Sequence, residues 1–318
     1  MDTPYEITVF VLPFSSPRQE KYSTKSTTYS GYSSLYTLSS VDWRRDPLAI
    51  DLDGDGIETV GIPTSGTPIL FGHDADGIKT GTGWLKGDDA WLVLDRNTSG
   101  GIDSGRELFG VDTAITVTEV LPGSSSVTTY TRLARSGFEA LGTLDKGNGT
   151  VGSAGYGDGV FNASDATFTQ VKLWQDLNQD GISQTNELFS LADKGIASIG
   201  LVANTTTTNL GNGNTLTGQA TVTRSNGGTT QIDSVDLQAS NLNLADNPFY
   251  RQFSDSIPLT PTAKILPEMG GSGWTRDLRE AISLNNPAAE QLAQFVTRFG
   301  AATTRDAQRS QIDSLLLR

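Results

Sequence analysis

The chain has 318 residues, and its 36 acidic residues against 23 basic ones give a formal net charge of −13. At about 150 residues per domain this length predicts two domains, and the negative charge argues against nucleic-acid binding and favours cations as ligands. The absence of cysteine excludes disulfides, thiol nucleophiles and thiolate metal sites, so any chemistry must depend on carboxylates, hydroxyls or a bound ion.

Residues 1–45 are expected to be a flank or linker. Residues 15–40 consist mostly of Ser, Thr, Tyr and Gly, and such a composition cannot bury much apolar area. No apolar run approaches the roughly 18 residues of a membrane span, and the segment 7–14 is interrupted by Pro13 and follows acidic residues. The sequence therefore predicts neither a membrane span nor an N-terminal signal peptide.

Residues 46–245 are the second predicted region. Up to about residue 110, short apolar runs such as 48–52 alternate with Asp and Gly clusters, which predicts short strands joined by ion-binding turns. Between 137 and 191, apolar residues recur at helical spacing on both sides of further acidic loops, which predicts helix, loop, helix. Residues 196–237 return to strand patterning and predict a hairpin.

The last stretch, residues 246–318, is expected to be mainly helical. Asn286 followed by Pro287 is a helix-start signal, an apolar stripe runs to Phe299, and Gly300 is a helix-end signal. We interpret the stripe as a packing surface. The whole pattern predicts an α+β fold, in which short strands and hairpins are combined with EF-hand-like helix-loop-helix calcium sites and C-terminal helices.

The sharpest local motif begins at Asp176 and matches the EF-hand loop rule in full. Calcium takes six to eight oxygen ligands, and the loop offers side chains at its first, third and fifth positions, a backbone carbonyl at its seventh and a bidentate Glu at its end. These ligands are predicted to be Asp176, Asn178, Asp180, the carbonyl of Ile182, and Glu187.

Several incomplete loops of the same kind accompany it. One runs from Asp95 to Glu107, and a second has Ile62 where the closing Glu should stand. The first half of a third is expected to be displaced by an insertion. So many clustered carboxylates would destabilise the fold without cations, so we expect three or more Ca²⁺ ions. The further predicted ligands are Asp51, Asp53, Asp55, Asp74, Asp76, Asp95, Asn97, Ser99, Asp103, Glu107, Asp158, Asn162 and Asp165.

The single histidine, His73, lies next to one of these clusters. It could be a ligand or a general base, but no partner is identifiable in the sequence. We interpret it as a hydrogen-bonded surface histidine.

A family resemblance rests on four segments in order. DPLAIDLDGDGIETVGI (46–62), FGHDADGIKTGTGWL (71–85), WLVLDRNTSGGIDSGRELFG (91–110) and VKLWQDLNQDGISQTNELFSL (171–191) resemble the self-processing module of FrpC-like, iron-regulated RTX proteins exported by type I secretion. The tail LPEMGGSGWTRDLREAISL (266–284) resembles segments that follow such modules. The nonapeptide repeats of RTX arrays are absent.

The resemblance implies a calcium-triggered cleavage of the Asp-Pro bond at the start of the module. By motif this bond is Asp46-Pro47, and the new C-terminal Asp could be joined to a lysine amine of another protein as an isopeptide. The resemblance also implies secretion to the exterior or cell surface by a type I system. The alternative is a non-catalytic, calcium-rigidified spacer or adhesion module, and a Ser-His-Asp hydrolase ranks third because His73 has no nucleophile-elbow context.

Overall fold

The computed structural model describes residues 46–120, 127–148, 156–225, 232–233 and 238–316. The chain divides into two compact units, residues 1–43 and 44–318, and all described residues belong to the second. The predicted flank 1–45 and the hairpin turn near residue 227 lie outside the described residues. The predicted boundary near residue 245 stays a prediction.

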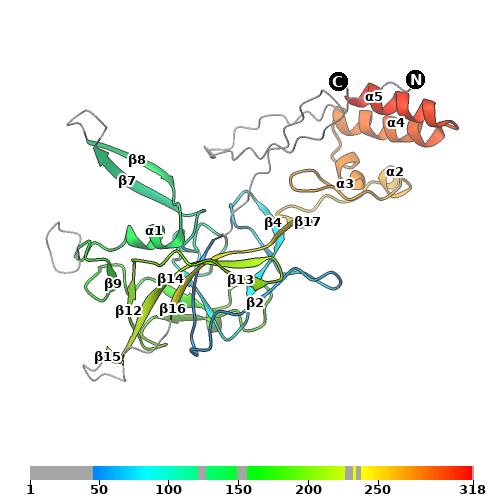
Figure 1. Cartoon of the computed structure of the whole chain (residues 1–318). Coiled ribbons are helices and arrows are strands. Elements are labelled where there is room, and N and C mark those ends of the chain that lie inside the picture. The colour runs from blue at the N-terminus through cyan, green and yellow to red at the C-terminus, as the bar shows by residue number, and fades with distance from the viewer. Residues whose placement is uncertain (1–45, 121–126, 149–155, 226–231, 234–237, 317–318) are drawn as a thin grey trace, which may run out of the picture. The chain divides into compact units, whose positions relative to one another are not determined.

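The structure is mostly β, with 30% of residues in strands and 18% in helices. The main sheet is antiparallel, and Figure 1 shows three of its strands, β12, β14 and β16, side by side. Its path is β11 (Leu188–Ser190), β10 (Lys172–Trp174), β6 (Ala90–Val93), β1 (Leu48–Ile50), β16 (Gln238–Asn243), β14 (Asn214–Ser225), β12 (Ile196–Gly200) and β9 (Val160–Asn162), with β13 (Thr208–Gly211) and β15 (Ile232–Asp233) paired to β14.

Smaller sheets and short helices complete the described part. The sheets are β17 (Asp246–Phe253) with β4 (Ile78–Thr82) and β3 (Leu70–Phe71), β2 (Thr59–Val60) with β5 (Trp84–Leu85), and β7 (Ala114–Val120) with β8 (Val127–Leu133). The helices are α1 (Gly137–Gly142), the 3₁₀ turn η1 (Thr185–Glu187), α2 (Pro261–Lys264), α3 (Leu278–Ile282), α4 (Pro287–Ala301) and α5 (Arg305–Leu316).

Strand β1 lies inside the main sheet between β6 and β16. Its side chains alternate between two apolar clusters, with Leu48 and Ile50 in one and Ala49 in the other, and all three residues are fully buried. The second cluster contains Trp84, whose ring centre lies 5.0 Å from that of Trp91. The Asp46-Pro47 bond, which directly precedes β1, is therefore joined to an inner strand of the main sheet.

The expected α+β class with EF-hand helix pairs is wrong. The loop that starts at Asp176 follows strand β10 and leads through η1 into β11, with no α-helix on either side. Leu173 and Trp174 enter different apolar clusters, as neighbours on a strand do. Short apolar runs fit helix and strand spacing equally, and here pairing with β6 decides for the strand.

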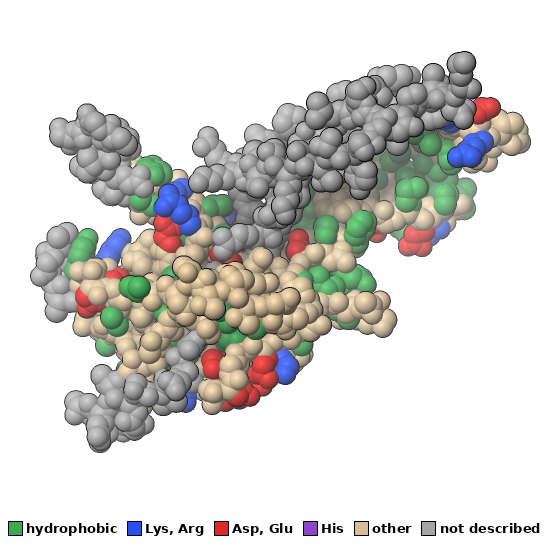
Figure 2. All heavy atoms as spheres, viewed as in Figure 1, with side chains coloured by type: hydrophobic (Ala, Val, Ile, Leu, Met, Phe, Trp, Pro, Cys, Tyr) green, Lys and Arg blue, Asp and Glu red, His purple; other side chains and the backbone are tan. Residues whose placement is uncertain are grey.

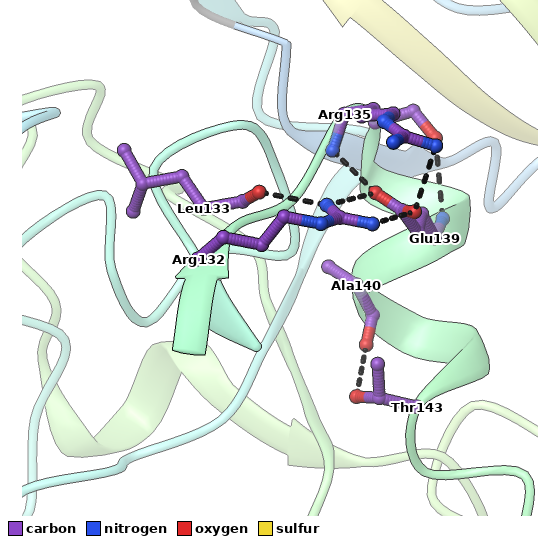
Figure 3. Close-up of polar contacts among 7 residues, drawn as sticks. Arg132, Leu133, Arg135, Glu139, Ala140 and Thr143 are labelled. Carbon is purple, nitrogen blue, oxygen red and sulfur yellow. Dashed lines mark hydrogen bonds and ion pairs between the residues drawn. The ribbon is translucent and has the colours of Figure 1, made fainter. Parts of the chain in front are cut away.

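Helix α1 is fixed to the end of β8 by side-chain hydrogen bonds (Figure 3). Ser136 caps its first turn by accepting a hydrogen bond from the backbone N–H of Glu139 (3.1 Å). The Arg132 guanidinium donates to both carboxylate oxygens of Glu139, at 2.6 and 3.0 Å, and this contact lowers the pKa of Glu139. The helix leads directly to Asp145, where an acidic loop begins.

The C-terminal helices are present where the cap signals predict them. Asn286 accepts a hydrogen bond from the N–H of Ala289 (2.8 Å), and Pro287 occupies the first turn of α4. The helix continues through Gly300 and ends at Ala301. None of the helices in the described part of the chain has both the length and the apolar character needed to cross a membrane.

Candidate functional site

The loop from Asp176 to Glu187 is organised around its first residue. Asp176 is 4% exposed, and its Oδ2 accepts hydrogen bonds from the N–H of Gly181 (2.9 Å) and from Nε1 of Trp84 (2.8 Å). Gly181 has a φ of +69°, and a Cβ there would lie 2.9 Å from a methyl group of Ile69. The turn therefore needs glycine for both its conformation and its space.

Glu187 closes the same loop from inside the protein. It is 2% exposed, its Oε1 accepts from the N–H of Leu177 (3.0 Å), and its Oε2 accepts from the N–H of Gln184 (3.2 Å). Asn178 and Asp180 are exposed on the outer side. Two buried carboxylates thus face a turn whose outer positions add oxygen atoms, which is a donor set suited to a hard cation.

The loop from Asp95 to Glu107 repeats this arrangement. Asp95 Oδ2 accepts from the N–H of Gly100 (2.8 Å), and the two oxygens of buried Glu107 accept from the N–H groups of Arg96 (3.1 Å) and Asp103 (2.7 Å). This loop is one residue longer than the loop from Asp176, but Glu107 still closes it as Glu187 closes the other.

The loop that begins at Asp51, which is the first acidic loop in the chain, has the same arrangement. Its closing carboxylate, however, comes from a residue outside the loop. Asp51 Oδ2 accepts from the N–H of Gly56 (3.1 Å). Asp89, which is 1% exposed, accepts from the N–H groups of Leu52 (Oδ1, 3.2 Å) and Glu58 (Oδ2, 3.1 Å). Asp89 therefore supplies the closing carboxylate that is missing at Ile62. The sequence analysis did not predict this residue as a ligand.

A fourth loop joins Asp145 to Asp165 across the insertion. Asp145 Oδ2 accepts from the N–H of Gly159 (2.9 Å), and Asp165 accepts from the N–H groups of Lys146 (2.9 Å) and Asn162 (2.9 Å). The second oxygen of Asp145, Oδ1, is buried and has no hydrogen-bond partner. An orphaned carboxylate oxygen is costly without a counter-charge, so this loop fits a cation well.

Other predicted ligands lie on the outer sides of these loops or apart from them. Asp76 Oδ1 accepts from the N–H of Ile78 (2.8 Å), but neither Asp74 nor Asp76 belongs to an acidic group close enough to share an ion within the described ranges. Two such groups are found there, Asp51 with Asp53 and Asp55, and Glu58 with Asp88 and Asp89. The exposed predicted ligands are Asp53, Asp55, Asn97, Ser99, Asp103, Asp158, Asn178, Asp180 and Ile182.

Three carboxyl groups of the acidic loops have raised pKa values. Burial raises the pKa of Asp89 to about 7 and also raises the pKa of Asp176. A hydrogen bond that the neutral Asp55 carboxyl group donates to Asp53, followed by burial and repulsion from neighbouring carboxylates, raises the pKa of Asp55. Figure 2 shows Asp and Glu side chains in separate groups on the visible face.

Calcium binding at the first loop is expected to weaken as the pH falls below 7. A carboxyl group must lose its proton to bind a cation, and Asp89 is increasingly protonated below a pKa of about 7. Affinity should therefore fall by up to about tenfold per pH unit between pH 7 and 5. At pH 6, where about nine tenths of Asp89 is protonated in the absence of calcium, calorimetry in two buffers of different ionisation enthalpy should detect about one proton fewer released by Asp89→Asn than by the unmodified chain. Equal proton release would contradict this assignment.

The Asp46-Pro47 bond lies just before β1 and is held from several directions. Asp46 is 1% exposed, and its Oδ1 accepts a hydrogen bond from the N–H of Val111 (2.8 Å). The carbonyl of Pro47 accepts from the N–H of Leu242 (3.1 Å). A Cβ at Gly110 would lie 3.1 Å from the Asp46 carbonyl oxygen and 3.2 Å from Pro47 Cα, so the backbone there approaches the bond closely.

His73 is buried next to this bond and is not a surface residue. It is 2% exposed, its Nε2 lies 3.0 Å from Oγ1 of Thr82, and its ring packs against Phe71. His73 and the Asp46-Pro47 bond line one small cavity of about 10 Å³. The prediction of a surface histidine is therefore wrong, because the ring is buried and its hydrogen-bond partner is the hydroxyl group of Thr82.

Comparison with known proteins identifies the family. The model of the SPM domain matches residues 48–238, so the match starts immediately after the Asp46-Pro47 bond, and the chain belongs to this family. The chain is also 41% identical over 271 residues to "Iron-regulated protein FrpA" of Neisseria meningitidis serogroup C. That alignment covers 85% of this chain and 21% of the relative. The resemblance to FrpC-like self-processing modules is confirmed.

Proposed function

We propose that this chain is a calcium-activated, single-turnover autoprotease that cleaves its own Asp46-Pro47 bond through an aspartyl anhydride. The observation that carries the proposal is that the Asp46 side chain is fixed in place. Its carboxylate is buried and held by the Val111 N–H at 2.8 Å, directly before the start of the family match. A nucleophile that is held beside the bond it attacks needs little further ordering.

The chemistry follows from the Asp-Pro pair. The Asp46 carboxylate can reach its own carbonyl carbon and close a five-membered anhydride while the bond to the Pro47 nitrogen breaks. Well-oriented intramolecular attack can supply on the order of 7 to 11 kcal/mol of the barrier, but a flexible chain would rarely hold the geometry. Water then opens the anhydride, or a lysine amine of another protein takes the acyl group as an isopeptide.

The proposed role of calcium is to order the segments that hold Asp46. Bound Ca²⁺ supplies the positive charge that relieves repulsion within the acidic loops. The first loop begins at Asp51, shortly after the bond, and the second closes at Glu107, shortly before Val111. The backbone between them is connected, because the N–H of Leu48 donates to the carbonyl of Phe109 (2.8 Å).

Mass spectrometry of the purified chain tests this function. After incubation in millimolar Ca²⁺ at neutral pH, two fragments should appear, one ending at Asp46 and one beginning at Pro47. In chelator the intact mass should persist. An unchanged mass after long incubation in calcium would refute the proposal and favour the second candidate, a calcium-rigidified spacer or adhesion module, which the four acidic loops support equally well.

Gly110→Ala is expected to slow cleavage while calcium binding persists. The added methyl group would press on the Asp46 carbonyl oxygen at 3.1 Å and on Pro47 Cα at 3.2 Å and push the bond away from the Val111 N–H. A displacement of this kind can cost on the order of 10²-fold in rate. Gly142→Ala is a matched control, because a Cβ there meets no atom within 4 Å. Equal cleavage rates for the two variants would show that this contact is unimportant.

We further propose export by type I secretion to the exterior or cell surface, with calcium as the ligand encountered there. The FrpA relative and the acidic loops support this placement. A low-calcium interior would keep the chain uncut until export.

A further inference from the structure

Cleavage leaves one chemical requirement unmet. When the bond to Pro47 breaks, the departing nitrogen becomes a secondary amine and must receive a proton. Apart from Asp46, two titratable side chains belong to the residues that line the cavity beside the bond, His73 and Asp112. The cavity measures about 10 Å³, close to the space of one water molecule.

The hydrogen bonds of His73 make it a poor acid. Thr82 Oγ1 has one proton and lies within hydrogen-bond distance of both the carbonyl of Gly83 (2.9 Å) and Nε2 of His73 (3.0 Å). Both contacts form together only when Oγ1 donates to the carbonyl and accepts from Nε2, and in that arrangement Nε2 carries the proton of the neutral ring. A charged imidazolium would be needed for donation toward the bond, and the ring is 2% exposed among Phe71 and Trp84.

Asp112 is on the same turn that holds Asp46. The preceding residue, Val111, donates its N–H to the Asp46 carboxylate, and Asp112 itself is 5% exposed. Thr113 fixes the turn, since its Oγ1 accepts from the N–H of Gly110 (3.0 Å) and donates to the carbonyl of Leu108 (2.6 Å). This turn thus places Asp112, a residue with a carboxyl group, in the lining of the cavity.

We propose that Asp112 is the general acid of the cleavage, a role that rests on the proposed function. As the Asp46 carboxylate oxygen bonds to the Asp46 carbonyl carbon, the bond from that carbon to the Pro47 nitrogen breaks. The nitrogen takes the proton of the Asp112 carboxyl group, directly or through one water in the cavity. Water or a lysine amine then opens the anhydride, and the Asp112 carboxylate accepts the proton that this nucleophile releases.

Asp112→Asn tests the role, because the amide keeps the size of the side chain and cannot act as the acid. In saturating calcium, cleavage followed by intact mass should slow by about 10² to 10⁴-fold. The residual rate should increase with hydronium concentration, since solvent must then supply the proton, and Asp112→Glu should retain part of the activity. Asp46 and His73 also line the cavity, so the pH profiles of Asp112→Asn and His73→Gln are compared.

Several outcomes separate this inference from the proposed function. If the unmodified chain does not cleave in calcium, the function itself fails. If it cleaves and Asp112→Asn cleaves at the same rate, or only His73→Gln is slow, Asp112 is not the acid. Calcium stoichiometry and melting temperature must match the unmodified chain, and exposed Glu290→Gln on α4 serves as the carboxyl-to-amide control. A slow Asp112→Asn with an unchanged pH profile would mean a structural role and would overturn the proposal.

Discussion

Asp46→Asn should abolish calcium-triggered cleavage, with a loss of at least about 10³-fold in rate, because a neutral amide is a far weaker nucleophile than a carboxylate. The substitution should leave the fold unchanged, because Asn has nearly the same size and shape as Asp. The amide oxygen can still accept the hydrogen bond that Val111 N–H gives to Asp46 Oδ1 at 2.8 Å. The loss therefore reports on chemistry, and intact mass after incubation in calcium measures it.

Two further variants test whether the intermediate is a five-membered anhydride. Asp46→Glu keeps the charge but would need a six-membered anhydride, so it should cleave much more slowly than the unmodified chain. Pro47→Ala restores a secondary amide and should slow release of the amine. Cleavage of Asp46→Asn at the original rate would exclude Asp46 as the nucleophile and would require another group to attack the bond.

Removal of calcium should cost the described fold most of its stability. A ligand present at 100 times its dissociation constant stabilises the folded state by about 2.7 kcal/mol per site. With all four loops occupied the total is on the order of 10 kcal/mol, which is comparable to the whole stability of a typical domain. At about 2 to 4 °C per kcal/mol, chelation should lower the melting temperature by roughly 20 to 40 °C.

Circular dichroism during thermal unfolding in chelator and in calcium measures this difference. Magnesium should substitute poorly, because it demands a compact octahedral shell and sheds water reluctantly. Glu187→Gln should remove one site from the stoichiometry, since Glu187 closes the loop in which every predicted ligand type is present. Identical melting curves in chelator and calcium would contradict ion-coupled folding.

Local signals in the sequence predicted local structure well. The loop from Asp176 to Glu187 and the start of α4 at Asn286 depend on residues a few positions apart, and the structure holds both together by short-range hydrogen bonds. The helices expected beside the loops were wrong because apolar runs of this length suit either spacing. Strand pairing across the sheet decided between them.

The remaining parts of the site depend on contacts between distant segments. Asp89 reaches the N–H of Leu52 across 37 residues because β1 and β6 are paired, and Val111 reaches Asp46 across 65. A single sequence does not contain those pairings. The Asp-Asp pair just before the apolar run of β6 was the available clue to Asp89, since it supplies carboxylates next to a buried strand.

The burial of the Asp46-Pro47 bond would give the proposed cleavage a kinetic consequence. Pro47 would stay anchored after the cut, because its carbonyl accepts a hydrogen bond from the N–H of Leu242 and the next residue enters β1. The new amine and the proposed anhydride would then face one another within a single molecule, at an effective concentration far above that of any outside amine. Rejoining of the chain would compete with every forward step. The yield of cut product would then depend on how fast Asp46 leaves the cavity as well as on how fast water or a lysine amine opens the anhydride.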